Sequence, residues 1–203
     1  MTNKLTAHDL TLIRGDRCLF ESLSFALESG GLLLFEGQNG SGKTSLLKTL
    51  VGILELESGE IRWNDVPVRQ IRQAFFESIA WMAHRVGFKA DLTLVENLHF
   101  ESSLRSTSMH RFDAVLERLH LSRLKRLPLR SLSAGQQRRV ALARMLLSDA
   151  ELWLMDEPFT NLDREGRELV LEITAEHLGD GGMCVIAAHQ DVPLDVPTTR
   201  IAL

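Results

Sequence analysis

The stretch GQNGSGKT, residues 37–44, follows a short apolar run at residues 32–35 and precedes a helical pattern that begins near Lys43. A strand, a glycine-rich loop and a helix in this order are the setting of a phosphate-binding loop. The three glycines allow backbone angles that residues with a Cβ avoid, so amide N–H groups can turn inward around phosphate oxygens at the positive end of the helix. The stretch therefore predicts a nucleotide phosphate site, with Lys43 at the outer phosphates and the Thr44 hydroxyl on Mg²⁺.

The whole loop is predicted to bind the nucleotide. The alternative is a glycine-rich turn with a surface lysine, but two fixed glycines followed by Lys and Thr arise by chance in roughly one chain in a hundred of this length. The predicted nucleotide-binding residues of the loop are Gly37, Gln38, Asn39, Gly40, Ser41, Gly42, Lys43 and Thr44.

Length and charge limit the class of protein. The 203 residues fit one domain, or a core with a subdomain, and the formal charge of −4 with dispersed lysines and arginines gives no nucleic-acid footprint. No apolar run approaches the ~18 residues that cross a bilayer, and the N-terminus lacks a charged-then-apolar leader, which predicts a protein on the cytosolic side. Cys18 and Cys184 are too few for a disulfide framework, and we expect both to be packing residues.

The pattern of apolar residues predicts an α/β fold. Alternation near residues 5–12, 23–27 and 60–63 indicates a small antiparallel sheet at the N-terminus. Continuous apolar runs at residues 32–35, 79–82, 152–155 and 183–188 are typical of strands covered on both faces, and predict a mainly parallel core. Apolar spacings of three and four at residues 94–104, 112–121 and 135–147 predict a helical insertion in the middle third.

Two further stretches carry chemistry. LSAGQ, residues 132–136, lies at the start of a predicted helix, with Ser133 in the position of an N-cap. LWLMDEP, residues 152–158, is an apolar strand ending in Asp156 and Glu157. At a strand end Asp156 can hold Mg²⁺ through a water while Glu157 orients or deprotonates an attacking water. Taken alone, the two carboxylates would more simply begin a surface turn.

With these motifs in order, the chain resembles the ATP-binding cassette nucleotide-binding subunits over essentially its whole length. The resemblance implies a P-loop NTPase fold, a single domain over residues 1–203, with a core at about 1–83 and 148–203 and a helical subdomain at about 84–147. It makes residues 37–44 the Walker A loop, 132–136 the signature, 152–158 the Walker B strand, 160–163 the D-loop and His189, after the apolar run 184–188, the switch histidine.

The resemblance also implies the activity and its residues. The activity is hydrolysis of ATP with Mg²⁺, and the family acts as head-to-tail dimers that hold each ATP between the Walker A loop of one subunit and the signature of the other. The predicted catalytic residues are Glu157 and His189, and the metal residues are Thr44 and Asp156. The predicted signature contacts to the partner subunit's ATP are Ser133, Gly135 and Gln136, with Asp163 in the D-loop.

Three positions depart from the general family pattern. Arg14 stands where most cassettes place an aromatic residue that stacks on adenine, so we expect its guanidinium to stack there, with a solvated turn arginine as the alternative. His84 stands at the position of the Q-loop glutamine, near the expected Mg²⁺ site. Ala134 replaces a signature glycine, which is tolerated only where its φ stays negative.

The same departures make the chain similar to the ATP-binding subunits of bacterial cytochrome c maturation haem exporters, together with the strings LTLVENLHF, LSAGQQRRVALAR, DEPFTNLD and AAHQ. That resemblance implies a peripheral ATPase on the cytoplasmic face of the inner membrane. It would act with separate membrane subunits and power haem export or release of the haem-loaded chaperone. The segment at residues 84–92 is expected to dock a membrane subunit, with packing of Phe88 inside the helical subdomain as the alternative.

Other functions stay open at this point. Without a CxxCH motif we expect this subunit not to bind haem itself. The alternatives are a soluble cassette ATPase for assembly or nucleic-acid maintenance, another small exporter subunit, and a nucleotide-dependent switch without turnover.

Overall fold

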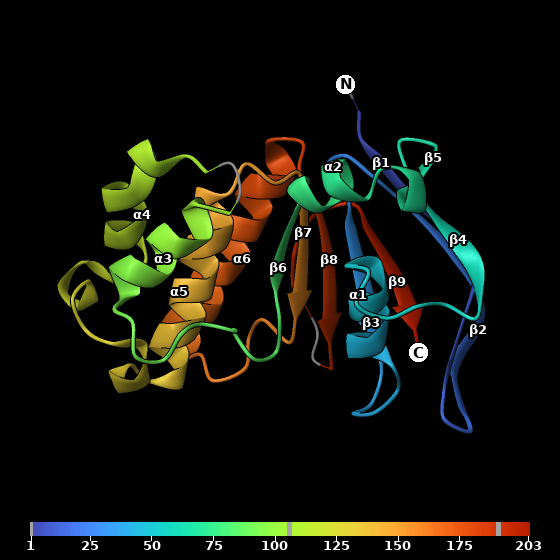
Figure 1. Cartoon of the computed structure of the whole chain (residues 1–203), viewed down its shortest axis with the longest axis horizontal. Coiled ribbons are helices and arrows are strands. Elements are labelled where there is room, and N and C mark those ends of the chain that lie inside the picture. The colour runs from blue at the N-terminus through green and yellow to red at the C-terminus, as the bar shows by residue number, and fades with distance from the viewer. Residues whose placement is uncertain (1, 105–106, 190–191) are drawn as a thin grey trace.

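The computed structural model describes residues 2–104, 107–189 and 192–203. Figure 1 shows an antiparallel sheet at one end, a parallel sheet in the middle and a group of helices at the other end. The antiparallel sheet has the order β2-β1-β4-β5. Its strands are β1 (Lys4–Arg14), β2 (Arg17–Glu28), β4 (Ser58–Trp63) and β5 (Val66–Pro67).

The central sheet is parallel throughout its described pairs and has the order β6-β7-β8-β3-β9. Its strands are β3 (Leu32–Glu36), β6 (Ile79–Met82), β7 (Leu152–Asp156), β8 (Met183–Ala188) and β9 (Thr198–Ala202). The helices are α1 (Lys43–Leu50), α2 (Arg72–Glu77), α3 (Leu94–Ser102), α4 (Phe112–Arg118), α5 (Ala134–Leu147) and α6 (Arg164–Gly179). Short 3₁₀ helices lie at Val68–Gln70, Met109–Arg111, Ser122–Leu124 and Leu129–Ser131.

The central sheet divides the apolar interior in two, because successive residues of a strand point to opposite faces. In β3, Leu32 and Leu34 pack with residues of α3, α4, α5 and α6, whereas Leu33 and Phe35 pack with α1, α2 and the antiparallel sheet. All four side chains are at most 1% exposed. Burial on both faces explains why the core strands have continuous apolar sequences.

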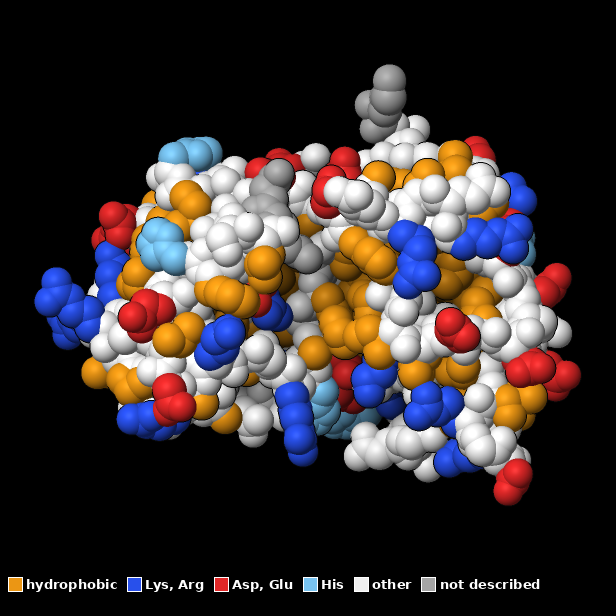
Figure 2. All heavy atoms as spheres, in the orientation of Figure 1, with side chains coloured by type: hydrophobic (Ala, Val, Ile, Leu, Met, Phe, Trp, Pro, Cys, Tyr) orange, Lys and Arg blue, Asp and Glu red, His pale blue; other side chains and the backbone are white. Residues whose placement is uncertain are grey.

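The predicted α/β class, parallel core and antiparallel sheet are confirmed. Helices α3, α4 and α5 follow β6 and precede β7 along the chain, and Figure 1 shows them gathered at one end of the molecule. The exact limits of the helical subdomain stay a prediction. On the face shown in Figure 2, hydrophobic side chains gather in the middle of the molecule, and acidic and basic side chains are interspersed around them.

The structure corrects one expectation about packing. Cys184 is fully buried, and burial raises the pKa of its thiol, as suits a packing residue. Cys18, however, is exposed, so its prediction as a packing residue is wrong. The physical reason is its place on β2, an edge strand, one residue beyond the turn from β1.

Candidate nucleotide-binding and catalytic site

The candidate site lies at the carboxyl ends of β3, β7 and β8, where the ends of parallel strands meet at one edge of the sheet. The loop after β3 runs into α1, and Gly42, with φ 111°, is the N-cap of that helix without a side-chain cap. The first N–H groups of α1 are therefore open to an anion. Gly37 has φ 156°, and a Cβ there would lie 2.7 Å from the Ser41 Oγ, so the close turn of the loop needs glycine.

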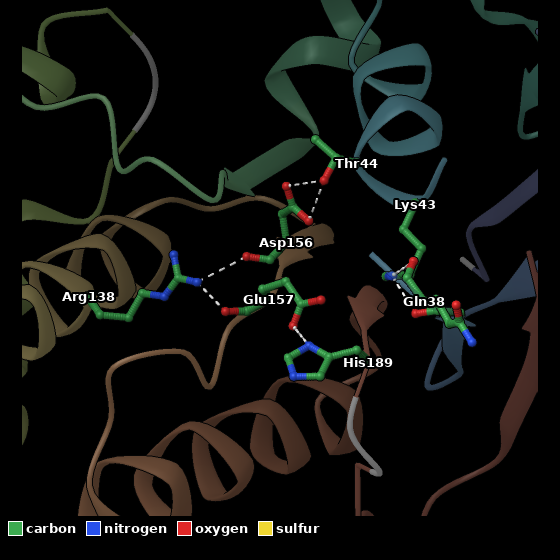
Figure 3. Close-up of polar contacts among 8 residues, drawn as sticks. Gln38, Lys43, Thr44, Arg138, Asp156, Glu157 and His189 are labelled. Carbon is green, nitrogen blue, oxygen red and sulfur yellow. Dashed lines mark hydrogen bonds and ion pairs between the residues drawn. The ribbon is translucent and has the colours of Figure 1, made fainter. Parts of the chain in front are cut away.

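Lys43 is folded back onto its own loop. Its Nζ donates hydrogen bonds to the carbonyl oxygens of Gly37 at 2.6 Å and Gln38 at 3.0 Å, and the residue is only 6% exposed (Figure 3). The Oγ of Ser41 is also buried and has no hydrogen-bond partner among the described residues. An ammonium that donates to uncharged carbonyl oxygens and an unsatisfied hydroxyl both suit a loop that closes around phosphate oxygens.

Asp156 and Thr44 form the second part of the site. The Thr44 Oγ1 lies 3.0 Å and 2.9 Å from the two carboxylate oxygens of Asp156, which is 1% exposed (Figure 3). Burial raises the pKa of Asp156 above its ordinary value, and the hydroxyl of Thr44 partly opposes that shift. A buried carboxylate beside a hydroxyl provides the hard oxygen ligands that Mg²⁺ prefers, with its remaining ligands left to phosphates and water.

Glu157 turns away from Asp156 although the two are adjacent. Its φ is 49°, a left-handed conformation that is uncommon outside glycine, and its amide donates to the Ala187 carbonyl at 2.8 Å. Its Oε2 lies 2.7 Å from the Nδ1 of His189, which follows β8. The backbone turn therefore separates the two carboxylates, as distinct roles for them would require, and such conformations cluster at functional sites.

A cavity of about 410 Å³ lies against Lys43, Thr44, Glu157 and His189. Its lining brings together most of the predicted nucleotide-binding and catalytic positions, including His84 at the Q-loop position. Its lining residues are Leu19, Asn39, Gly40, Gly42, Lys43, Thr44, Ser45, His84, Glu157, Thr160 and His189. Arg14 is not among them and is exposed at the end of β1, so its stacking on the base stays a prediction. Gln190, the last residue of the AAHQ string, lies outside the described residues.

The signature residues form a separate surface. Ser133 is the N-cap of α5: its Oγ accepts from the Gln136 amide at 3.2 Å, and the Gln136 side chain accepts from the Ser133 amide at 2.9 Å. The N-cap prediction for Ser133 is thus confirmed, and Ala134 lies in the helix, outside the positive-φ residues. A larger residue would not fit at Gly135, at the helix start, because a Cβ would lie 2.9 Å from the Asn161 carbonyl oxygen.

The signature residues also line a cavity. A cavity of about 540 Å³ is lined by Ser133, Gly135, Gln136 and the D-loop residue Asp163, together with Arg139 and residues around His120. Asp163 is the N-cap of α6, where its Oδ1 accepts from the Gly166 amide at 2.8 Å, and Arg139 lies 3.6 Å away. Among the described residues, no side chain lines both this cavity and the one around Lys43.

Sequence reasoning missed Arg138, to which no role is assigned from the sequence. It is 4% exposed, and its guanidinium reaches the backbone carbonyls of Asp156 and Glu157 (Figure 3). Burial lowers its pKa, and the nearby carboxylates oppose that shift. A signal was available: Arg138 lies three and four residues before the apolar Ala141 and Leu142, on the buried face of the helix.

The parallel sheet and its phosphate loop define the chain as a P-loop ATPase. The chain belongs to the ABC transporter family, whose model matches residues 20–160. The fold class, the family and the ATPase activity predicted from the motifs are therefore confirmed, and the nucleotide bound by this family is ATP.

Curated relatives show which members of this family the chain resembles. The chain is 42% identical over 189 residues, 93% of its length and 87% of the relative, to the cytochrome c biogenesis ATP-binding export protein CcmA of Yersinia pestis. It is 43% identical to the CcmA of Nitrosospira multiformis, over 92% of this chain and 91% of that protein. A solved ABC transporter ATP-binding protein from Pyrococcus furiosus is 28% identical, with a TM-score of 0.83 over 97% of this chain and 96% of that one. The resemblance drawn from the motifs is confirmed.

Proposed function

We propose that this chain is the ATP-hydrolysing subunit of a membrane ABC complex in cytochrome c biogenesis, in which hydrolysis powers haem export or release of a haem-loaded chaperone. The observation that carries the proposal is identity of 38–43% over at least 91% of the chain with proteins named as cytochrome c biogenesis ATP-binding export proteins.

The arrangement of the site supports a mechanism of phosphate positioning and water activation. Lys43 exchanges its loop carbonyls for phosphate oxygens, and Glu157 holds the attacking water and accepts its proton. His189 keeps the Glu157 carboxylate oriented through their 2.7 Å contact. Thr44 and Asp156 would hold Mg²⁺, which supplies charge neutralisation on the phosphates when bound.

The two separate cavities support a dimer. One chain offers Lys43 and Glu157 in one cavity, and Ser133 and Gly135 at a helix N-terminus in another. A head-to-tail pair of chains would face each signature cavity toward the partner's phosphate loop and so form two composite ATP sites. We propose that ATP drives this homodimer.

Membrane subunits are the other proposed partners. Within residues 2–104, 107–189 and 192–203, no helix has the length and apolar character needed to cross a bilayer. The proposed location is the cytoplasmic face of the bacterial inner membrane, reached through the segment at residues 84–92. There Gly87 has φ 70°, and the chain turns so that Val86 and Phe88 line a cavity of about 330 Å³ with Leu129.

The test of this function is a deletion in the bacterium that carries the gene. Haem staining of membrane fractions should show loss of c-type cytochromes, restored by the wild-type chain and not by Lys43→Ala. Full c-type cytochromes in the deletion strain, with no second copy of the gene, would reject the role in cytochrome c biogenesis while leaving the ATPase assignment intact.

A further inference from the structure

Arg138 connects three parts of the chain that are far apart in sequence. It lies on α5, two residues after the end of the signature. Its Nη1 donates to the carbonyl oxygens of Ala83 at 3.0 Å and His84 at 3.4 Å. Its Nη2 donates to the carbonyl oxygen of Asp156 at 3.0 Å and also contacts that of Glu157 (Figure 3).

In these contacts the Arg138 guanidinium holds backbone segments by hydrogen bonds rather than forming an ion pair. The planar guanidinium has donors in a fixed fork, so one side chain can hold two backbone segments in a set relation. All four acceptors are backbone carbonyls, and the two segments carry the Q-loop position and the catalytic carboxylates. The residue is 4% exposed, so little water competes for these bonds.

The backbone that Arg138 holds is the part that sets the direction of Glu157. Glu157 has its left-handed φ of 49° at this point, and its amide is fixed separately by Ala187 of β8. A strained conformation persists only where its surroundings hold it. We propose that Arg138 is a positioning residue for hydrolysis: it fixes the Glu157 backbone against α5 and against the His84 segment, and so sets the direction of the Glu157 carboxylate. This proposal rests on the proposed role of Glu157 as the base.

The experiment is a double-mutant cycle on the purified full chain. Arg138→Gln should lower kcat roughly 10- to 100-fold, in the range of a misplaced catalytic group, while KM for ATP stays within about twofold. In a chain that already carries Glu157→Gln, the same change should lower the residual kcat less than about threefold, because Arg138 acts through Glu157. Arg138→Lys, which keeps the charge but not the fork, should recover only part of kcat.

Arg118→Gln is the matched control. Arg118 also joins the helical part to the core, through Glu172 and Glu176 of α6, but does not contact the catalytic segments. It should leave kcat unchanged. If Arg138→Gln does not fold, the cycle is run with Arg138→Lys, for which we expect at least a threefold loss of kcat.

The outcomes separate the two proposals. Unchanged kcat for Glu157→Gln would reject the role of Glu157 and with it the Arg138 proposal. A large loss for Glu157→Gln with kcat within twofold of wild type for the Arg138 variant would reject the Arg138 proposal alone. So would losses that multiply in the double variant, because they would show that Arg138 acts independently of Glu157.

Discussion

The Nδ1 of His189 lies 2.7 Å from the Oε2 of Glu157, which joins the ends of two neighbouring parallel strands, β7 and β8. The Glu157 side chain is 15% exposed and the His189 side chain 42%, so the contact lies at the opening of the nucleotide cavity. A carboxylate held by an imidazole at this place is already oriented in the nucleotide-free chain, which suits the proposed role of Glu157 as a general base.

Glu157→Gln should abolish most ATP hydrolysis while the binding of ATP is retained. The amide keeps the shape and can still accept from His189, but it cannot take a proton, so kcat should fall roughly 10²- to 10⁴-fold. Steady-state hydrolysis and ATP titration of the same sample measure the two effects, and the ATP-bound dimer should persist in size-exclusion chromatography. Turnover equal to wild type would remove Glu157 from its role.

Lys43→Ala should instead weaken the binding of ATP, because it removes a charged partner of the phosphates. We expect ATP affinity to fall at least tenfold, as measured by calorimetry. The control is Lys48→Ala, a change in the last turn of the same helix, which should leave ATP affinity unchanged. Tight binding of ATP by Lys43→Ala would contradict the assignment of the loop.

Asp156→Asn should stabilise the nucleotide-free chain while it removes activity. Burial raises the pKa of Asp156 in the folded state, so the folded chain binds this proton more tightly than the unfolded chain. The contribution of the group to stability is therefore greatest below the ordinary pKa and falls as the pH rises through the raised value. At pH 7 the variant should have a higher Tm than wild type.

The control for this change is a variant at an exposed aspartate, and the effect of Mg²⁺ on Tm is the second measurement. Asp16→Asn, at an exposed turn, should leave Tm at pH 7 unchanged. The added stabilisation that Mg²⁺ gives to the ATP complex should be lost in Asp156→Asn but kept in Asp16→Asn. A lower Tm for Asp156→Asn at pH 7 would show that the ionised carboxylate stabilises the fold.

The sequence predicted the three loops of the site because each depends on local chemistry: glycines before a helix, a serine at an N-cap and acidic residues after an apolar strand. It did not predict β9, whose sequence TTRIA is mostly polar and becomes a strand by pairing with β3 at the edge of the sheet. It also missed Arg138, because the carbonyls that satisfy this arginine come from segments about 20 and 55 positions away. Local patterns do not encode such long-range partners.

Arg14→Ala tests the contact with the base. If the guanidinium stacks on adenine, KM for ATP should rise by the equivalent of about 0.5 to 2 kcal/mol, and Arg14→Tyr should restore it. Leu19 lines the cavity around Lys43, whereas Arg14 does not, so Leu19 is the position for comparison. Leu19→Ala should also raise KM for ATP. An unchanged KM for Arg14→Ala, with a raised KM for Leu19→Ala, would make Arg14 a plain turn residue.

Phe88→Ala tests the route from ATP to the membrane. Phe88 is half-buried, packs against the helical side of the core and lies under the Arg144 guanidinium, 5.0 Å from its ring centre. It also lines the cavity of about 330 Å³ between the segment at residues 84–92 and residues around Leu129, and we expect it to anchor an apolar side chain of a membrane subunit there. Replacement by alanine should release the subunit from membranes and abolish c-type cytochromes.

The control must separate docking from packing, because Phe88 has both kinds of contact. Purified Phe88→Ala should still fold and bind ATP, since the ring is not fully buried. Leu104→Ala removes a side chain that is 67% exposed and outside this cavity, and it should leave membrane retention unchanged. Fractionation and haem staining in cells whose only copy carries each change give the result. Normal retention and normal cytochromes with Phe88→Ala would reject docking at this segment, because the subunit would then reach the membrane without its apolar anchor.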